Sequence, residues 1–68
     1  MNLPLTDYLA DTFTVAAQEF RDHAERLRKA PEYSAAGSLG EILRAAAEEH
    51  YQRAAVLDDI VKRYKESK

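Results

Sequence analysis

The sequence contains no cysteine, and its 68 residues include only two glycines and two prolines. Without cysteine the chain has no disulfide framework and no thiolate zinc site. A domain of this size buries only about 60% of the surface that its unfolded chain exposes, so it needs a further source of stability. The remaining sources are association with another chain, or a metal held by histidine and carboxylate ligands.

Long apolar runs are also missing. A bilayer-spanning helix needs about 20 predominantly apolar residues, and here polar or charged residues interrupt every apolar run after a few positions. The first residues, Met1 to Pro4, have neither the basic region nor the apolar run of a signal peptide. We therefore predict a cytoplasmic protein with no membrane partner.

The positions of helix-capping residues and of proline predict two helices joined by one connection. Thr6 is suited to cap a first helix over about residues 6–30, and Pro31 disfavours helical geometry at the residue before it. Ser38 and Glu41 have the spacing of a capping box, which predicts a second helix over about 39–66. The connection, about 31–38, is short enough to make the helices antiparallel. The fold class is all-α: a single antiparallel two-helix hairpin.

Apolar residues recur at intervals of three and four along both predicted helices, which is the period of an amphipathic helix. We expect these rows to form the core of the hairpin: Leu9, Phe13, Ala16, Phe20, Ala24 and Leu27 in the first helix, and Leu39, Leu43, Ala46, Leu57, Ile60 and Tyr64 in the second. This spacing pairs Phe20 with Glu49 or His50 across the hairpin.

Two helices cannot enclose stripes this wide, because each helix has only one partner to cover it. Ile42, Ala54 and Val61 lie beside the central row of the second helix and give it a second contact face. We expect a second copy to cover these faces through coiled-coil-like packing, making a four-helix bundle from two chains. The predicted apolar interface residues are Leu39, Ile42, Leu43, Leu57, Ile60, Val61 and Tyr64.

A polar break interrupts the stripe of the second helix at His50 and Arg53, and His23 lies on the flank of the first. One interpretation is that Arg53 pairs with Glu49 while His50 is a neutral core histidine bonded to a neighbour. The other is that His50, Arg53 and Glu49 form a polar layer at the dimer centre. Such a layer fixes register at some cost in stability, as a buried Asn does in coiled coils.

A metal site is an alternative use of the same region, with Glu19, His23, Glu49 and His50 as candidate ligands. Di-iron bundles need a Glu three residues before each ligand histidine, and here that place is taken by Phe20 and by Ala47. What remains is a mononuclear site assembled across a dimer. We predict no cofactor.

Catalysis finds little support in the sequence. Ser38 is better used as a helix cap, and adjacent carboxylates such as Glu48 and Glu49 diverge by about 100° around a helix. There is no phosphate-binding loop. Tyr51 points away from the apolar stripe, so it either is solvated or marks a second interface.

The net charge is −2, from 10 basic and 12 acidic residues, so no cationic field draws in nucleic acid. The sequence therefore predicts a small non-catalytic protein–protein interaction or regulatory module. We expect it to act as a homo-oligomer and to bind another protein. The alternatives are a bundle that binds a metal or small ligand in its polar layer, and a small nucleic-acid-associated regulator.

Overall fold

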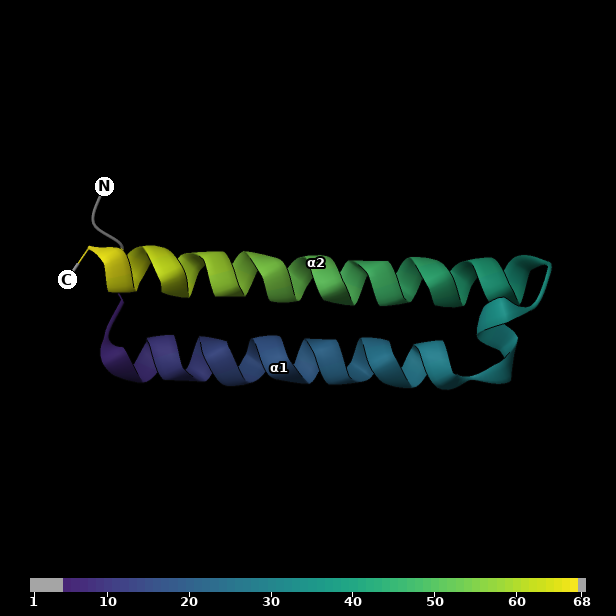
Figure 1. Cartoon of the computed structure of the whole chain (residues 1–68), viewed down its shortest axis with the longest axis horizontal. Coiled ribbons are helices and arrows are strands. Elements are labelled where there is room, and N and C mark those ends of the chain that lie inside the picture. Colours follow the sequence, from purple (N-terminus) through teal and green to yellow (C-terminus); the bar gives the residue numbers. More distant parts are fainter. Residues whose placement is uncertain (1–4, 68) are drawn as a thin grey trace.

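The computed structural model describes residues 5–67 and forms one antiparallel helical hairpin. Its elements are α1 (Asp7–Lys29), the short 3-10 helix η1 (Pro31–Ser34) and α2 (Ser38–Glu66). The two long helices lie side by side, so the start of α1 and the end of α2 meet at the same end of the hairpin (Figure 1). The predicted all-α antiparallel hairpin is confirmed.

The start and the end of α1 follow from local chemistry. The Thr6 hydroxyl accepts a hydrogen bond from the backbone N–H of Leu9 at 3.2 Å, which satisfies one of the free donors of the first turn. The helix ends at Lys29, because Ala30 adopts the extended backbone (ψ 135°) that a following proline favours. Pro31 then occupies the first turn of η1, where its missing N–H costs nothing.

The start of α2 differs from the prediction. The N-cap is Gly37, with φ at 102°, and no side chain bonds to the cap, so the predicted capping box of Ser38 and Glu41 is wrong. The backbone N–H of Glu41 donates to the Gly37 carbonyl at 3.2 Å. Glycine alone reaches this φ without strain. The chain therefore turns into the helix one residue earlier, with Ser38 as the first helical residue.

The connection packs closely on the first turn of α2 because Gly40 has no side chain. A Cβ at Gly40 would lie 2.0 Å from the carbonyl oxygen of Ala35. Arg44, one turn further on, donates from Nη1 to the carbonyls of Tyr33 at 2.7 Å and Ala35 at 3.3 Å. Gly40 and Arg44 together hold the connection against the helix.

The interior of the hairpin is a line of small residues at seven-residue intervals, which we call the alanine seam. It consists of Ala10, Ala17 and Ala24 in α1, and Gly40, Ala47, Ala54 and Val61 in α2. Side chains this small let two helices approach closely, since the interaxial distance depends on the residues at the contact. A seven-residue repeat keeps such a line facing its partner along the full helix length.

The alanine seam corrects the predicted core. Of the expected core residues, Ala24 is buried, whereas the other predicted positions are half-buried and Leu39 is 55% exposed. Conversely Ala54 and Val61, expected on a second contact face, are buried between the helices. The reason is volume: large side chains do not fit between backbones that alanine brings together, so they are displaced to one side of the contact.

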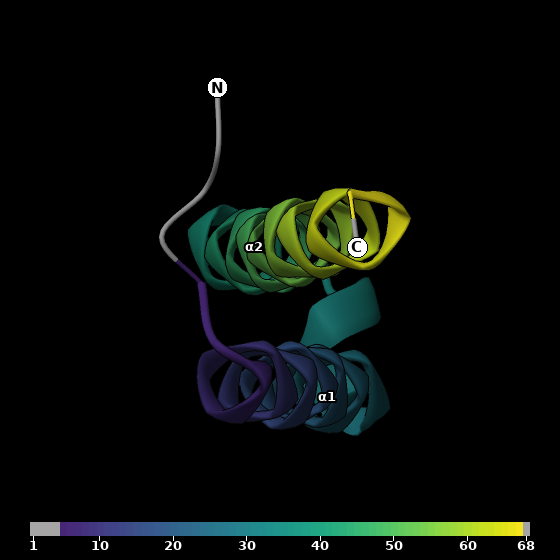
Figure 2. The same ribbon diagram turned by 90° about the vertical axis from the view of Figure 1, so that its left-hand side faces the viewer.

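The hairpin is a single layer of two helices, as the end-on view shows (Figure 2). Its extents are 47 × 19 × 14 Å. The radius of gyration is 15.2 Å, whereas a compact domain of this length has about 11 Å. Within residues 5–67 the structure has no helix with the length and apolar content needed to cross a bilayer.

Candidate protein-interaction surface

The large apolar side chains gather on one side of the alanine seam. They occupy the positions three residues after and one residue before each seam residue, which helical geometry places on the same side in both antiparallel helices. We call this surface the apolar face; its apolar members are Leu9, Phe13, Ala16, Phe20 and Leu27 of α1, and Leu39, Leu43, Ala46, Leu57, Ile60 and Tyr64 of α2. All of them are half-buried except the exposed Leu39.

The three remaining positions of the same rows are His23, His50 and Arg53, which we call the polar belt. His50 stacks on Phe20, with ring centroids 5.7 Å apart and an interplanar angle of 26°. His23 contacts the same histidine at a centroid distance of 5.9 Å. The predicted neighbourhood of Phe20 and His50 is therefore confirmed.

Arg53 of the polar belt forms an ion pair with Glu49, one turn earlier in α2. Arg53 Nη2 lies 2.5 Å from Glu49 Oε1, and both side chains are more than half exposed. This is the pairing that the first interpretation of the polar break predicts. An exposed pair one helical turn apart contributes only a few tenths of a kcal/mol.

The same interpretation expects His50 to be hydrogen-bonded to a neighbour, and for its Nδ1 the structure shows no such bond. Its Nδ1 is buried, and no hydrogen-bond partner for it exists among the described residues. A buried polar atom without a partner costs about 1–3 kcal/mol. His50 is held by ring contacts with Phe20 and His23 instead of by a bond through Nδ1.

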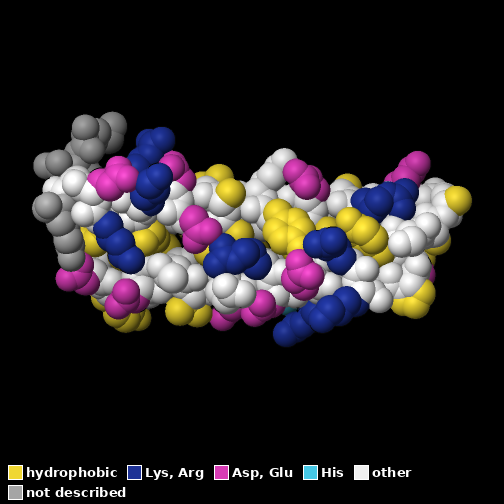
Figure 3. Space-filling model, viewed as in Figure 1, with side chains coloured by type: hydrophobic (Ala, Val, Ile, Leu, Met, Phe, Trp, Pro, Cys, Tyr) yellow, Lys and Arg dark blue, Asp and Glu magenta, His cyan; other side chains and the backbone are white. Residues whose placement is uncertain are grey.

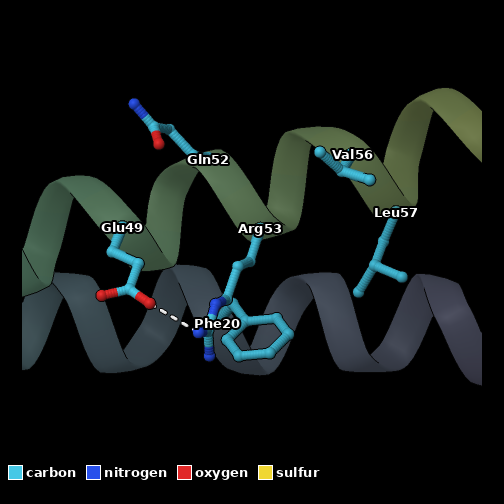
Figure 4. A pocket seen from close by; sticks show the side chains of 6 residues that line it. All are labelled: Phe20, Glu49, Gln52, Arg53, Val56 and Leu57. Atoms are coloured by element: carbon cyan, nitrogen blue, oxygen red, sulfur yellow. Dashed lines mark hydrogen bonds and ion pairs between the residues drawn. The ribbon is translucent and has the colours of Figure 1, made fainter.

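A shallow hollow of about 470 Å³ opens beside the polar belt. Figure 4 views it from the side opposite to Figure 1, with α2 above α1 and running from left to right. Its lining residues are Phe20, Glu49, Gln52, Arg53, Val56 and Leu57. Arg53 extends from α2 toward the ring of Phe20, while Val56 is 59% exposed at the edge. The hollow joins apolar surface from both helices at the middle of the apolar face.

The other side of the alanine seam is polar. Arg21 and Asp58 form an ion pair between the helices with an N···O distance of 2.6 Å. Tyr51 donates to Glu25 and accepts from Arg28 Nη1 at 3.2 Å. Figure 3 shows basic and acidic side chains along the line where the helices meet. Tyr51 is thus a half-buried bridge between the helices.

Tyr51 also sets the charge state of its neighbours. Its hydrogen bond lowers the pKa of the Glu25 carboxyl below its usual value, against a smaller opposing effect of desolvation and with help from the charges of Arg28 and Lys29. The same hydroxyl raises the pKa of the Arg28 guanidinium. Both groups stay charged at neutral pH, which keeps this side of the hairpin hydrophilic.

The predicted metal ligands are only partly brought together. His23 and His50 are in ring contact, but residues 5–67 of one chain contain no group of three His, Cys, Asp or Glu side chains placed to hold a metal ion. Glu19 and Glu49 therefore do not complete a site with the histidines inside a single hairpin.

Comparison of the chain with protein-family models, curated proteins and solved structures gave no significant match.

The alanine seam is the feature that reasoning from large apolar residues missed. Its signal is nonetheless present in the sequence, as small residues recurring every seven positions from Ala10 to Ala24 and again from Gly40 to Ala54.

Proposed function

We propose that this chain is a small non-catalytic helical module that acts through protein–protein contact, and that its working form is a homodimer assembled through the apolar face. The observation that carries the proposal is that small side chains fill the contact between the helices while large apolar side chains lie outside it. The alanine seam holds the hairpin together, and the phenylalanines, leucines and isoleucine beside it are left half-exposed on one side.

The amount of exposed surface supports a partner. The chain exposes 5123 Å², whereas a compact monomer of 7.7 kDa exposes roughly 4,300 Å². The excess is several hundred Å². A standard protein–protein interface takes about 800 Å² from each partner, so the exposed excess is of the order that one interface buries.

The pattern of polarity supports a second copy as that partner. The apolar face is apolar toward both ends of the hairpin, and its polar members His23, His50 and Arg53 lie near the middle. When two copies meet with their centres aligned, the polar members lie in the central part of the interface and apolar ends face apolar ends. A two-fold interface requires this self-complementarity, and the result is a four-helix bundle with a two-hairpin core.

Light scattering coupled to gel filtration tests the proposal. We expect a mass close to twice the 7.7 kDa of the single chain at low micromolar concentration. The circular dichroism of the same sample should be strongly helical. A well-folded, strictly monomeric protein at that concentration would overturn the proposal.

A further inference from the structure

The register of the apolar face specifies how two copies fit together, beyond the fact of their pairing. We propose that α1 lies antiparallel on the partner's α1 and α2 antiparallel on the partner's α2, so that the two connections lie at opposite ends of the bundle. The two-fold axis is then perpendicular to the helices and passes through the polar belt. This inference rests on the proposed homodimer.

The α2 pair shows the register most clearly. In one axial register of the antiparallel pair, each residue three positions after a residue of the alanine seam lies opposite a residue one position before a seam residue of the partner. Leu43 then faces the partner's Ile60, and Leu57 faces the partner's Ala46. The same register places Tyr64 opposite the partner's Leu39, and His50 opposite the partner's Arg53. Each apolar side chain of these pairs thus meets an apolar one, and Leu57 meets the small Ala46.

The α1 pair has the same property. Phe20 faces the partner's Ala16, Leu27 faces the partner's Leu9, and Phe13 faces the partner's His23. Phe20, one of the largest side chains of the face, therefore meets one of its smallest. Small residues opposite large ones let the two layers interdigitate without voids.

A single axis serves both pairs. The midpoint of the α2 register falls between His50 and Arg53, and that of the α1 register falls at Gln18. Because His50 contacts both Phe20 and His23, Gln18 lies level with the stretch from Gln52 to Ala55 in the hairpin. The two midpoints thus lie within about one helical turn, or 5.4 Å, of each other.

The other two-fold arrangement packs less well. An axis parallel to the helices keeps every residue at its own height and stacks α1 on the partner's α2. Phe20 would then meet the partner's His50 at the same level, and Phe13 the partner's Leu57. Each phenylalanine would then oppose another large side chain at its own level, whereas the first arrangement sets Phe20 against the small Ala16, and Ala16 would lie level with the long side chain of the partner's Arg53.

Charges at the helix ends are compatible with the proposed arrangement. α1 has Asp7 in its first turn and Arg26, Arg28 and Lys29 in its last turn. α2 begins with Glu41 and ends with Arg63 and Lys65. Antiparallel pairing of like helices brings each acidic start beside a basic end, which is favourable for both the charges and the helix dipoles.

The absence of cysteine allows a direct test. Leu43→Cys and Ile60→Cys are prepared as separate single variants, mixed, allowed to exchange chains, and oxidised with oxidised glutathione. A disulfide needs Cα atoms about 4.4–6.8 Å apart. We expect a covalent dimer in the mixture and none in either variant alone, because like positions lie about 25 Å apart along the pair.

A second pair keeps the test decisive if one variant misfolds. Ala46→Cys mixed with Leu57→Cys should cross-link in the same way, and the reduced form of each variant is checked by light scattering and circular dichroism. Dimers of full mass that fail to cross-link in both mixtures would overturn the arrangement and leave the proposed function standing. Cross-linking of Leu43→Cys with itself would also overturn the arrangement, whereas a monomeric wild-type protein would overturn the proposed function itself.

Discussion

Phe20 of α1 and His50 of α2 are stacked in the middle of the apolar face, with ring centroids 5.7 Å apart. The contact places a titratable ring with a buried, unpartnered Nδ1 on an aromatic surface, among otherwise apolar positions of the same row. In coiled coils a buried polar residue lowers stability and fixes how the helices align, and we propose the same role for His50.

Replacing His50 tests that role. We expect His50→Leu to raise the free energy of unfolding by roughly 1 kcal/mol, because the unpartnered nitrogen disappears and apolar contact with Phe20 is kept. The same variant should lose uniqueness of assembly and populate species other than the dimer. Urea unfolding and sedimentation velocity measure the two effects. A His50→Leu protein that stays strictly dimeric and no more stable would contradict the register role.

The position of the interface is tested by a matched pair of valines. Val56 borders the central hollow and is 59% exposed, whereas Val15, on the outer side of α1, is 58% exposed. Val56→Asp should weaken dimerisation at least about tenfold, or 1.4 kcal/mol, because each copy would bring a carboxylate into the contact. Val15→Asp should leave the dissociation constant unchanged. Equal effects of the two substitutions on the dissociation constant would place the interface elsewhere.

The close packing of the connection makes Gly40 sensitive to substitution. Gly40→Ala should lower the free energy of unfolding by about 1–3 kcal/mol, despite the better helix propensity of alanine, because its Cβ meets the Ala35 carbonyl oxygen. Chemical denaturation measures this change. Ser38→Ala is the control, since Ser38 does not cap α2. Ser38→Ala should change the free energy of unfolding by less than about 0.5 kcal/mol. A decrease of about 1 kcal/mol would show instead that Ser38 caps α2.

The bridge made by Tyr51 predicts a pH effect. Because the hydrogen bond from Tyr51 lowers the pKa of Glu25 below 4.5, the carboxylate stabilises the folded chain above its unfolded pKa. That contribution is lost as the pH falls through the lowered folded pKa. Tyr51→Phe should raise the pKa of Glu25 toward its usual value. The stability difference from wild type should therefore be largest above pH 4.5 and shrink in more acidic solution.

Carboxyl-resolved NMR titration of Glu25, with urea unfolding at several pH values, measures the predicted shift. Tyr8→Phe is the matched control, because Tyr8 is exposed and lies on the outer side of α1. If Tyr51→Phe left the Glu25 titration where it is in the wild type, the bridge would not be formed in solution.

Small-angle X-ray scattering distinguishes side-by-side from end-to-end pairing. Two aligned hairpins separated by about 10 Å have a radius of gyration of about 16 Å, little more than the 15.2 Å of one hairpin. End-to-end association over the 47 Å length would give about 28 Å. We expect a doubled forward scattering with the smaller radius.

Several features were predictable because they depend on neighbours in sequence. Thr6 begins α1 and Pro31 ends it, since capping and proline sterics act over a few residues. The neighbourhood of Phe20 and His50 also followed from counting outward from a short connection. The pairing of Arg53 with Glu49 needs only the helical repeat.

The tertiary structure decided which row of each helix faces the other. The apolar stripe is wider than one contact, so its period alone does not say whether Ala17 or Phe20 lies innermost. Packing resolves this by distance: helices that meet through alanine come close, and large side chains must then lie beside the contact. The tertiary structure also decided the cap at Gly37 and the close contact at Gly40. Both depend on the path that the connection takes against the first turn of α2. The sequence by itself determined two amphipathic helices and a polar break, whereas only their packing turned the large apolar residues into a surface.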